Sequence, residues 1–139
     1  MMVSLQDIKK NFYTFRNGII ADTLRKAGMP YKVIFGLQIP QIAAIARELQ
    51  PSMELADTLW GNKEVRESRI LATYLYPREE VTEEKALELL SAVITPEESD
   101  MLAFRLLKHL PFAAELAGKI ESNPLIPAYA ADSLKRHLS

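Results

Sequence analysis

The stretch from Tyr31 to Leu75 decides the fold of this chain. It opens with Phe35-Gly36-Leu37-Gln38-Ile39-Pro40, in which the proline suits the first turn of a following helix. Apolar residues then recur at helical spacing, and two further helical patterns follow. The residues that mark these three patterns are Ile42, Ile45, Ala46 and Leu49, then Leu59 and Trp60, then Glu67, Arg69 and Ala72. The stretch therefore predicts a short loop followed by three consecutive helices.

Helical spacing and clear breaks extend over the rest of the chain. Ser4 is a candidate cap for a first helix, and Thr95-Pro96-Glu97-Glu98 is the strongest helix start in the sequence. The one strand-like run, Tyr31 to Phe35, is unpartnered, and we interpret it as an extended connector. The predicted helices cover residues 5–15, 19–27, 40–50, 52–60, 63–76, 83–94, 95–110, 112–121 and 127–138.

Short helices joined by short turns pack as antiparallel neighbours, and each is too short to be stable alone. We therefore predict an all-α protein with one domain over residues 1–139. Pairs of about 35 to 45 residues favour a short HEAT-like stack of helix pairs, and a compact bundle is also consistent with the pattern.

Composition narrows the classes of function. The chain has no cysteine, which excludes disulfides and thiolate metal sites. We expect no transmembrane helix, because no apolar run approaches about 20 residues, and no secretory signal. A cytoplasmic protein is the default expectation.

Charge is unevenly distributed although the net charge is −1. Residues 1–50 carry 7 Lys and Arg against 3 Asp and Glu, residues 51–100 carry 5 against 12, and residues 101–139 carry 5 against 3. Folding can gather the basic ends into one patch, or the charges can form ordinary solvated faces. Both interpretations stay open on the sequence alone.

The motifs of the 31–75 stretch resemble the AlkD family of bacterial alkylpurine DNA glycosylases, which are built from HEAT-like repeats. The resemblance rests on the Phe35-to-Pro40 segment, on Leu59-Trp60 and on the helix carrying Glu67 and Arg69, in the family's order. These blocks cover about a third of the chain. The resemblance implies an α-helical DNA repair scaffold that acts on alkylated purines.

The family's site, by the same resemblance, uses aromatic side chains, a carboxylate that stabilises a cationic sugar and an arginine from a later repeat. Its pattern, close to Trp-Trp-Asp-x-x-Asp, falls at the helix start near Thr95. If Asp100 matches the first aspartate, Ala103 takes the place of the second and supplies no charge. Glu98 or Asp100 can replace it only in a shifted register, and Glu98 also suits a capping role. The resemblance therefore implies a shortened relative that lacks the family's catalytic set, with Asp100 and Glu98 as weak candidates.

Basic residues on the predicted helices are candidate contacts to DNA phosphates, which bind charge without reading sequence. Arg66, Arg69, Arg105 and Lys108 are the ones that we place beside the family's DNA-facing groove, and a further basic group near the N-terminus comprises Lys9, Lys10, Arg16, Arg25 and Lys26.

Other candidate sites are weaker. We expect Trp60 to pack in the core, the Glu67 and Arg69 region to form ion pairs, and His109 to contact the carbonyls at its helix end. His109 and His137 have no carboxylate at metal-ligand spacing, so we predict neither a metal nor a cofactor.

Two functions from different classes follow. The first is an AlkD-like protein of DNA alkylation repair, with little or no glycosylase activity, that binds the backbone of duplex DNA through a basic face. The second is a HEAT-type scaffold that holds a protein partner or a second copy of itself. An active glycosylase on alkylated purines ranks third.

Overall fold

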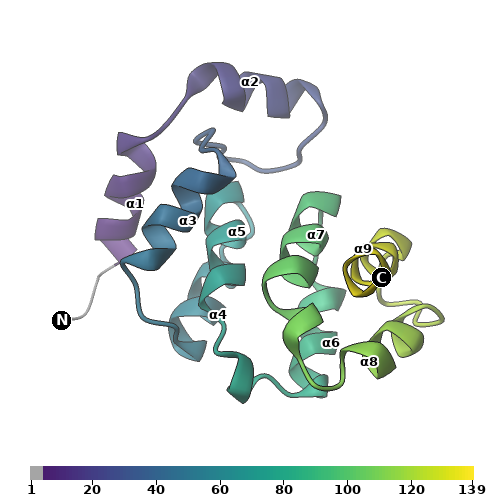
Figure 1. The fold of residues 1–139 in the computed structure, drawn as a ribbon. Helices are drawn as coiled ribbons and strands as arrows, with labels where there is room; N and C mark the ends of the chain where they lie inside the picture. Colours follow the sequence, from purple (N-terminus) through teal and green to yellow (C-terminus); the bar gives the residue numbers. More distant parts are fainter. Residues whose placement is uncertain (1–4) are drawn as a thin grey trace. The chain divides into compact units, whose positions relative to one another are not determined.

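The protein is helical throughout the part that the structure, a computed structural model, describes, residues 5–139 (Figure 1). Nine α-helices and two short 3₁₀ helices occur in that range, which also contains no strand. The predicted all-α class is therefore confirmed. The residues form two compact units, an N-terminal unit that ends at Leu75 and a C-terminal unit, Tyr76–Ser139, and each is described by itself. A single domain over 1–139 stays a prediction, and the predicted cap at Ser4 lies outside the described residues.

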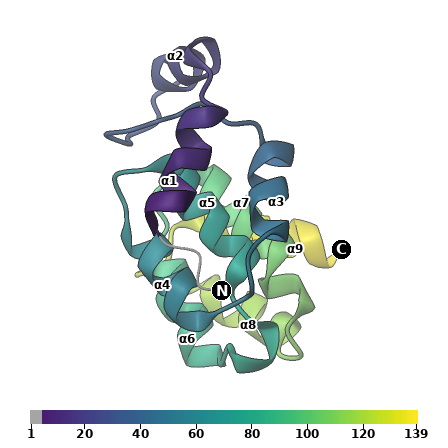
Figure 2. The same ribbon diagram turned by 90° about the vertical axis from the view of Figure 1, so that its left-hand side faces the viewer.

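Helix α5 is the centre of the N-terminal unit. It packs against α4 and α3, and nine of its ten residues are buried. By contrast, α2 has no buried residue and lies at one end of the unit, apart from α3, α4 and α5 (Figures 1 and 2). The helices of this unit are α1 (Leu5–Thr14), α2 (Gly18–Lys26), α3 (Ile39–Arg47), α4 (Met53–Gly61) and α5 (Arg66–Leu75).

Helix α5 begins three residues later than predicted. The backbone of the expected first turn does not form helix bonds there and pairs with Val33 instead. The amide of Val33 donates to the Glu64 carbonyl at 2.9 Å, and the amide of Arg66 donates to the Val33 carbonyl at 3.2 Å. These bonds form an isolated parallel bridge between Val33 and Val65. The strand-like run from Tyr31 to Phe35 is thus an extended connector, as predicted, but the prediction that it is unpartnered was wrong, because Val33 pairs with Val65 just before the start of α5.

Gly36 lets this connector pass close to the start of α2. Its φ is +87°, and a Cβ built on it would lie 2.1 Å from the carbonyl oxygen of Asn17. The amide of Asn17 in turn donates to the Phe35 carbonyl at 2.8 Å, and the Asn17 side chain caps α2. Any side chain at position 36 would therefore meet backbone atoms, which explains why the motif contains a glycine.

The core of the C-terminal unit lies where α7 packs against α9, with α8 also contacting α9 (Figure 1). Its elements are η1 (Arg78–Glu80), α6 (Glu83–Ser91), α7 (Pro96–Arg105), η2 (Leu107–His109), α8 (Ala113–Ile120) and α9 (Ala128–Leu138). The predicted start of α7 is confirmed, because the Thr95 hydroxyl accepts the amide of Glu98 at 3.2 Å.

The predicted helix over 95–110 is broken in two. Helix α7 ends at Arg105, Leu106 has φ −124° and ψ −64°, and η2 follows at once. This change of direction leaves Leu106, Leu107 and Leu110 all at most 4% exposed. A continuous α-helix turns about 100° per residue, so it does not readily direct these three positions and Leu102 into one core. The break also sets the positions of the charged residues that follow α7.

Candidate functional site

In the N-terminal unit, the charged side chains at the start of α5 hold the connector in place. The Glu67 carboxylate is fully buried and accepts two backbone amides, that of Phe35 at 3.0 Å and that of Gly36 at 3.1 Å. It also pairs with the Arg66 guanidinium at 2.7 Å, which donates to the Leu37 carbonyl at 2.9 Å. We call this group the Glu67 anchor. Charge-assisted bonds of this kind are strong because the site is dry.

Arg69 is also fully buried, one turn further along α5. Its guanidinium donates to the Trp60 carbonyl at 2.6 Å and lies over the indole ring, 3.7 Å from the centroid. Trp60 is 6% exposed, so its predicted core role is confirmed. A buried cation over an aromatic face contributes about 2 kcal/mol.

These contacts remove two residues from the expected DNA-binding set. Arg66 is 3% exposed and Arg69 is 0% exposed, and both guanidinium groups are used inside the unit. Neither side chain can reach a phosphate while the unit is folded. The place of both beside a DNA-facing groove stays a prediction that their burial does not favour, because helical spacing alone does not distinguish an arginine that faces solvent from one bonded to backbone carbonyls.

Glu98 is likewise occupied inside its own unit. It is fully buried, and its carboxylate accepts the amide of Ile94 at 2.9 Å beside the start of α7. Burial and then the Glu98 charge raise the pKa of Tyr129. Glu98 therefore supports the start of the helix and does not face an external ligand.

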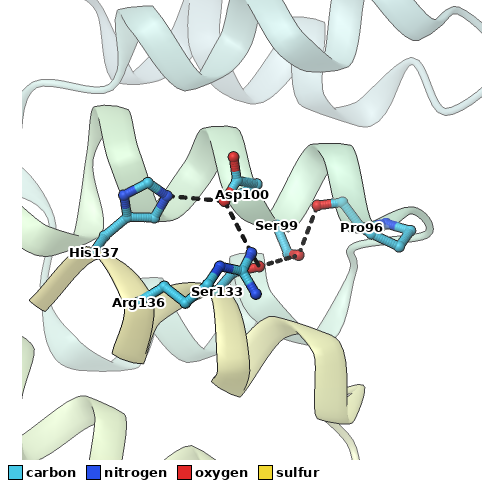
Figure 3. Close-up of polar contacts among 6 residues, drawn as sticks. All are labelled: Pro96, Ser99, Asp100, Ser133, Arg136 and His137. Carbon is cyan, nitrogen blue, oxygen red and sulfur yellow. Dashed lines mark hydrogen bonds and ion pairs between the residues drawn. The ribbon is translucent and has the colours of Figure 1, made fainter. Parts of the chain in front are cut away.

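Asp100 has a different environment, on the side of α7 that meets α9 (Figure 3). Its carboxylate oxygen Oδ1 lies 2.8 Å from Nε2 of His137 and 3.2 Å from the Arg136 guanidinium. Arg136 also donates to the Ser133 hydroxyl, which is hydrogen-bonded to Ser99. The Asp100 side chain remains 45% exposed, so this cluster of one anion and two basic groups is accessible from outside.

The stripe of α7 that carries Asp100 continues with an exposed aromatic residue and with cations. Phe104 is 42% exposed, and its ring centroid lies 5.4 Å from that of His137. The Lys108 ammonium lies 4.3 Å from the same centroid, and the Arg105 guanidinium lies 5.9 Å from it. Asp100 and Phe104 lie four residues apart on α7, and Lys108 follows on η2. Together with Arg105 and the cluster on α9, they form a surface that we call the α7–α9 face.

The electrostatics of its outer end are positive. Desolvation first, then the charges of Arg78, Lys108 and Arg105, lower the pKa of His109, although a bond to the Phe104 backbone opposes the shift. That bond confirms the predicted contact of His109 with its helix end. Arg78, contributed by η1, also donates to the Arg105 carbonyl at 3.3 Å. Arg78, Lys108 and Arg105 therefore all contribute positive charge that acts on His109.

The chain matches the family model described as DNA alkylation repair enzyme over residues 8–119. The chain belongs to this family. No curated protein and no solved structure gives a significant match. The matched range includes α7 and the cations of η1 and η2, and α9 with Arg136 and His137 lies beyond it.

In this DNA alkylation repair family member, the sequence did not single out Arg78, Phe104 or Arg136 as candidates, and it gave no sign that His137 lies beside Asp100. Arg136 and His137 are 36 and 37 residues from Asp100, so only the packing of α9 on α7 brings them together. The sequence around Phe104 likewise gives no sign that this side chain is exposed. Lys135 beside them is paired with Glu121.

The sequence also gives predictions for the N-terminal basic group, metal ligands and membrane-spanning helices. The five basic residues near the N-terminus are all exposed, and Arg25 donates to the Tyr31 carbonyl at 3.0 Å. Over residues 5–139 no three histidine or acidic side chains gather as metal ligands. Over the same range no helix combines the length and the apolar character that crossing a membrane requires.

Proposed function

We propose that this DNA alkylation repair family member binds the sugar–phosphate backbone of duplex DNA through the α7–α9 face. The observation that carries the proposal is the group of cations at the end of α7: the Lys108 ammonium lies 4.3 Å from the Phe104 ring centroid, the Arg105 guanidinium lies 5.9 Å from it, and Arg78 donates to the Arg105 carbonyl at 3.3 Å. Several cations close together attract an anion. Because the chain belongs to a DNA alkylation repair family, we take that anion to be a DNA phosphate. Arg66 and Arg69 have no part in it, since both are buried in the N-terminal unit.

Salt dependence of binding tests this proposal. Each cation that neutralises a phosphate contributes about 0.9 to the slope of log K against log salt concentration. We expect Lys108→Gln to weaken binding of any duplex sequence and to lower that slope by about 1. Lys119→Gln is the matched control, because it removes the same charge from a lysine that is paired with Glu83. Absence of binding at low salt, measured by fluorescence anisotropy, would refute the proposal.

A second candidate function is a residual glycosylase activity on alkylated purines, and Asp100 favours it. A sugar that loses its base develops positive charge, which a fixed carboxylate stabilises. Ala103 is 1% exposed and faces the core, whereas the Asp100 carboxylate is accessible and paired with an arginine of a later helix. This geometry supports the shifted register, in which Asp100 is the catalytic anion.

Base release from methylated duplex DNA tests this candidate. If the activity exists, Asp100→Asn should reduce it by about 10²-fold or more. Asp132→Asn, a change at an exposed aspartate of α9, is the control. If the wild-type protein releases no methylated purine, the glycosylase candidate is refuted, whereas the proposed binding of the DNA backbone is unaffected.

An interaction scaffold is the alternative from another class. The N-terminal unit exposes several large apolar side chains near α1 and α2: Leu5, Tyr13, Phe15 and Ile19, of which Ile19 is 80% exposed. Light scattering at increasing protein concentration tests self-association, and a strict monomer that also captures no partner would count against it.

A further inference from the structure

A pocket of about 310 Å³ lies in the N-terminal unit, between helix α1, the connector and the turn that precedes α5. Its volume is near the low end of the range of about 300–1,000 Å³ that small-molecule sites span. Aromatic side chains line it: the ring centroid of Phe35 lies 5.5 Å from that of Phe12 and 5.0 Å from that of Tyr13. The pocket therefore suits the apolar part of a small organic molecule.

The backbone around the pocket is held in place by bonds within the unit. The Val33 amide donates to the Glu64 carbonyl at 2.9 Å, and the Val65 amide donates to the Asn62 carbonyl at 3.3 Å. The connector is also held by its bonds to the Glu67 anchor. Binding therefore requires little ordering of the backbone, which favours affinity for a small ligand.

The pocket also carries charges of both signs. Lys9, from α1, and Glu64, from the turn before α5, both line it, and both residues are exposed. Within residues 5–139, neither side chain forms an ion pair with another side chain. Asn62 lines the same pocket with an amide that can both donate and accept hydrogen bonds. A ligand that matches this lining has one cationic group, one anionic group and an apolar body.

We propose that this pocket binds a free α-amino acid with an apolar side chain. The ligand carboxylate pairs with the Lys9 ammonium, the ligand ammonium pairs with the Glu64 carboxylate, and the ligand side chain contacts the aromatic rings. The inference is independent of the proposed DNA binding, which concerns the α7–α9 face.

The occupant is argued from charge complementarity. A fatty acid or a nucleotide would bring an anion toward Glu64, and a hydrophobic amine would bring a cation toward Lys9, and like charges brought together oppose binding. A peptide carries its charged termini on different residues and so does not present both groups on one carbon. A free amino acid satisfies both charges and the aromatic lining together.

The experiment uses L-phenylalanine and two analogues that each lack one of its charged groups, 2-phenylethylamine and 3-phenylpropanoate. Isothermal titration calorimetry gives the dissociation constant of each, and NMR shifts of the Val33 and Val65 amides show whether the ligand occupies this pocket. We expect the wild-type protein to bind L-phenylalanine about 5-fold more tightly than either analogue, the upper end of what an exposed ion pair contributes. Glycine, which lacks the apolar body, should bind more weakly than L-phenylalanine.

Each charge variant should remove one of the two preferences. Lys9→Gln should bind L-phenylalanine no more tightly than 2-phenylethylamine, and Glu64→Gln should bind it no more tightly than 3-phenylpropanoate. Tyr13→Ala should weaken binding of L-phenylalanine, whereas Tyr13→Phe should retain it. Lys10→Gln is the matched control, because it removes the same charge from an exposed lysine of α1 that does not line the pocket. Amide shifts outside the pocket that match those of the wild-type protein show that each variant is folded.

The outcomes separate this inference from the proposed function. If the wild-type protein fails to bind L-phenylalanine at its highest soluble concentration, or binds it without shifts at Val33 and Val65, the inference is overturned. Equal binding of L-phenylalanine and both analogues, or preferences that survive in Lys9→Gln and Glu64→Gln, also overturn it. Binding of duplex DNA is measured separately and is unaffected by any of these results.

Discussion

Replacing Glu67 by glutamine tests whether the Glu67 anchor holds the N-terminal unit together. The side chains have nearly the same volume, so the change alters charge and bonding without opening a cavity. The carboxylate now satisfies the amides of Phe35 and Gly36 and the guanidinium of Arg66. A glutamine has one acceptor oxygen, and its NH₂ group must face one of these donors.

The magnitude follows from the groups that lose a partner. If the amide oxygen keeps Gly36 and Arg66, the buried amide of Phe35 faces another donor, which costs about 1–3 kcal/mol. Arg66 also loses its counter-charge while it is 3% exposed, and breaking a buried pair costs about 3–5 kcal/mol. These terms overlap because they concern one group. We expect a loss of about 3–5 kcal/mol in the free energy of unfolding.

Urea unfolding followed by circular dichroism measures the change. Glu48→Gln, at an exposed glutamate just after α3, removes the same charge without touching a buried donor and should change the free energy by less than about 0.5 kcal/mol. If Glu67→Gln costs no more than this control, the anchor does not stabilise the unit and the argument is wrong.

Three further predictions concern single positions. Gly36→Ala should destabilise the N-terminal unit by more than about 2 kcal/mol in urea unfolding, since φ is +87° and the new Cβ would meet the Asn17 carbonyl; equal stability would contradict the close approach. Thr95→Ala should cost about 1 kcal/mol through the lost cap of α7, whereas Thr95→Ser, measured in the same way, should restore most of it. The pKa of His109 should lie below 6.5 in an NMR titration and should rise in Lys108→Gln, although not to the ordinary value, because burial is the larger cause.

The sign of the His109 effect on stability follows from that direction. A histidine with a lowered folded-state pKa binds its proton more tightly when unfolded. Its contribution to stability is therefore present above about pH 6.5, the unfolded value, and is lost as the pH falls through the lower folded value. Replacing His109 by asparagine should reduce the pH dependence of unfolding in this window and leave neutral-pH stability nearly unchanged.

Much of the fold is predictable from the sequence because its signals are local. Proline, glycine and capping residues mark the helix ends, as Thr95 and Pro96 do for α7, and apolar spacing gives the buried side of each helix. No local sequence signal predicts the late start of α5 or the break at Leu106. The first depends on the bridge from Val33, and the second depends on burying three leucines in one core.

The candidate site is less predictable for the same physical reason. An arginine at helical spacing gives no sign of whether it will be buried against a carbonyl, like Arg69, or exposed, like Arg136. Asp100 and His137 become neighbours only through the packing of α7 on α9. Family resemblance supplied the class of protein, and the candidate side chains on the α7–α9 face become visible only in three dimensions.

The burial of charge inside the N-terminal unit has a practical consequence for redesign. The fold of the N-terminal unit depends on three buried charged residues, Arg66, Glu67 and Arg69. Substituting them is expected to lower the solubility and the yield of folded protein, so such variants give little information about ligand binding. On the α7–α9 face, the side chains of Asp100, Phe104 and Arg136 are exposed and that of Lys108 is partly exposed, so their exchange should leave the interior intact. Libraries that test the proposed DNA binding should therefore vary positions 100, 104, 108 and 136 and leave the residues around Gly36 untouched.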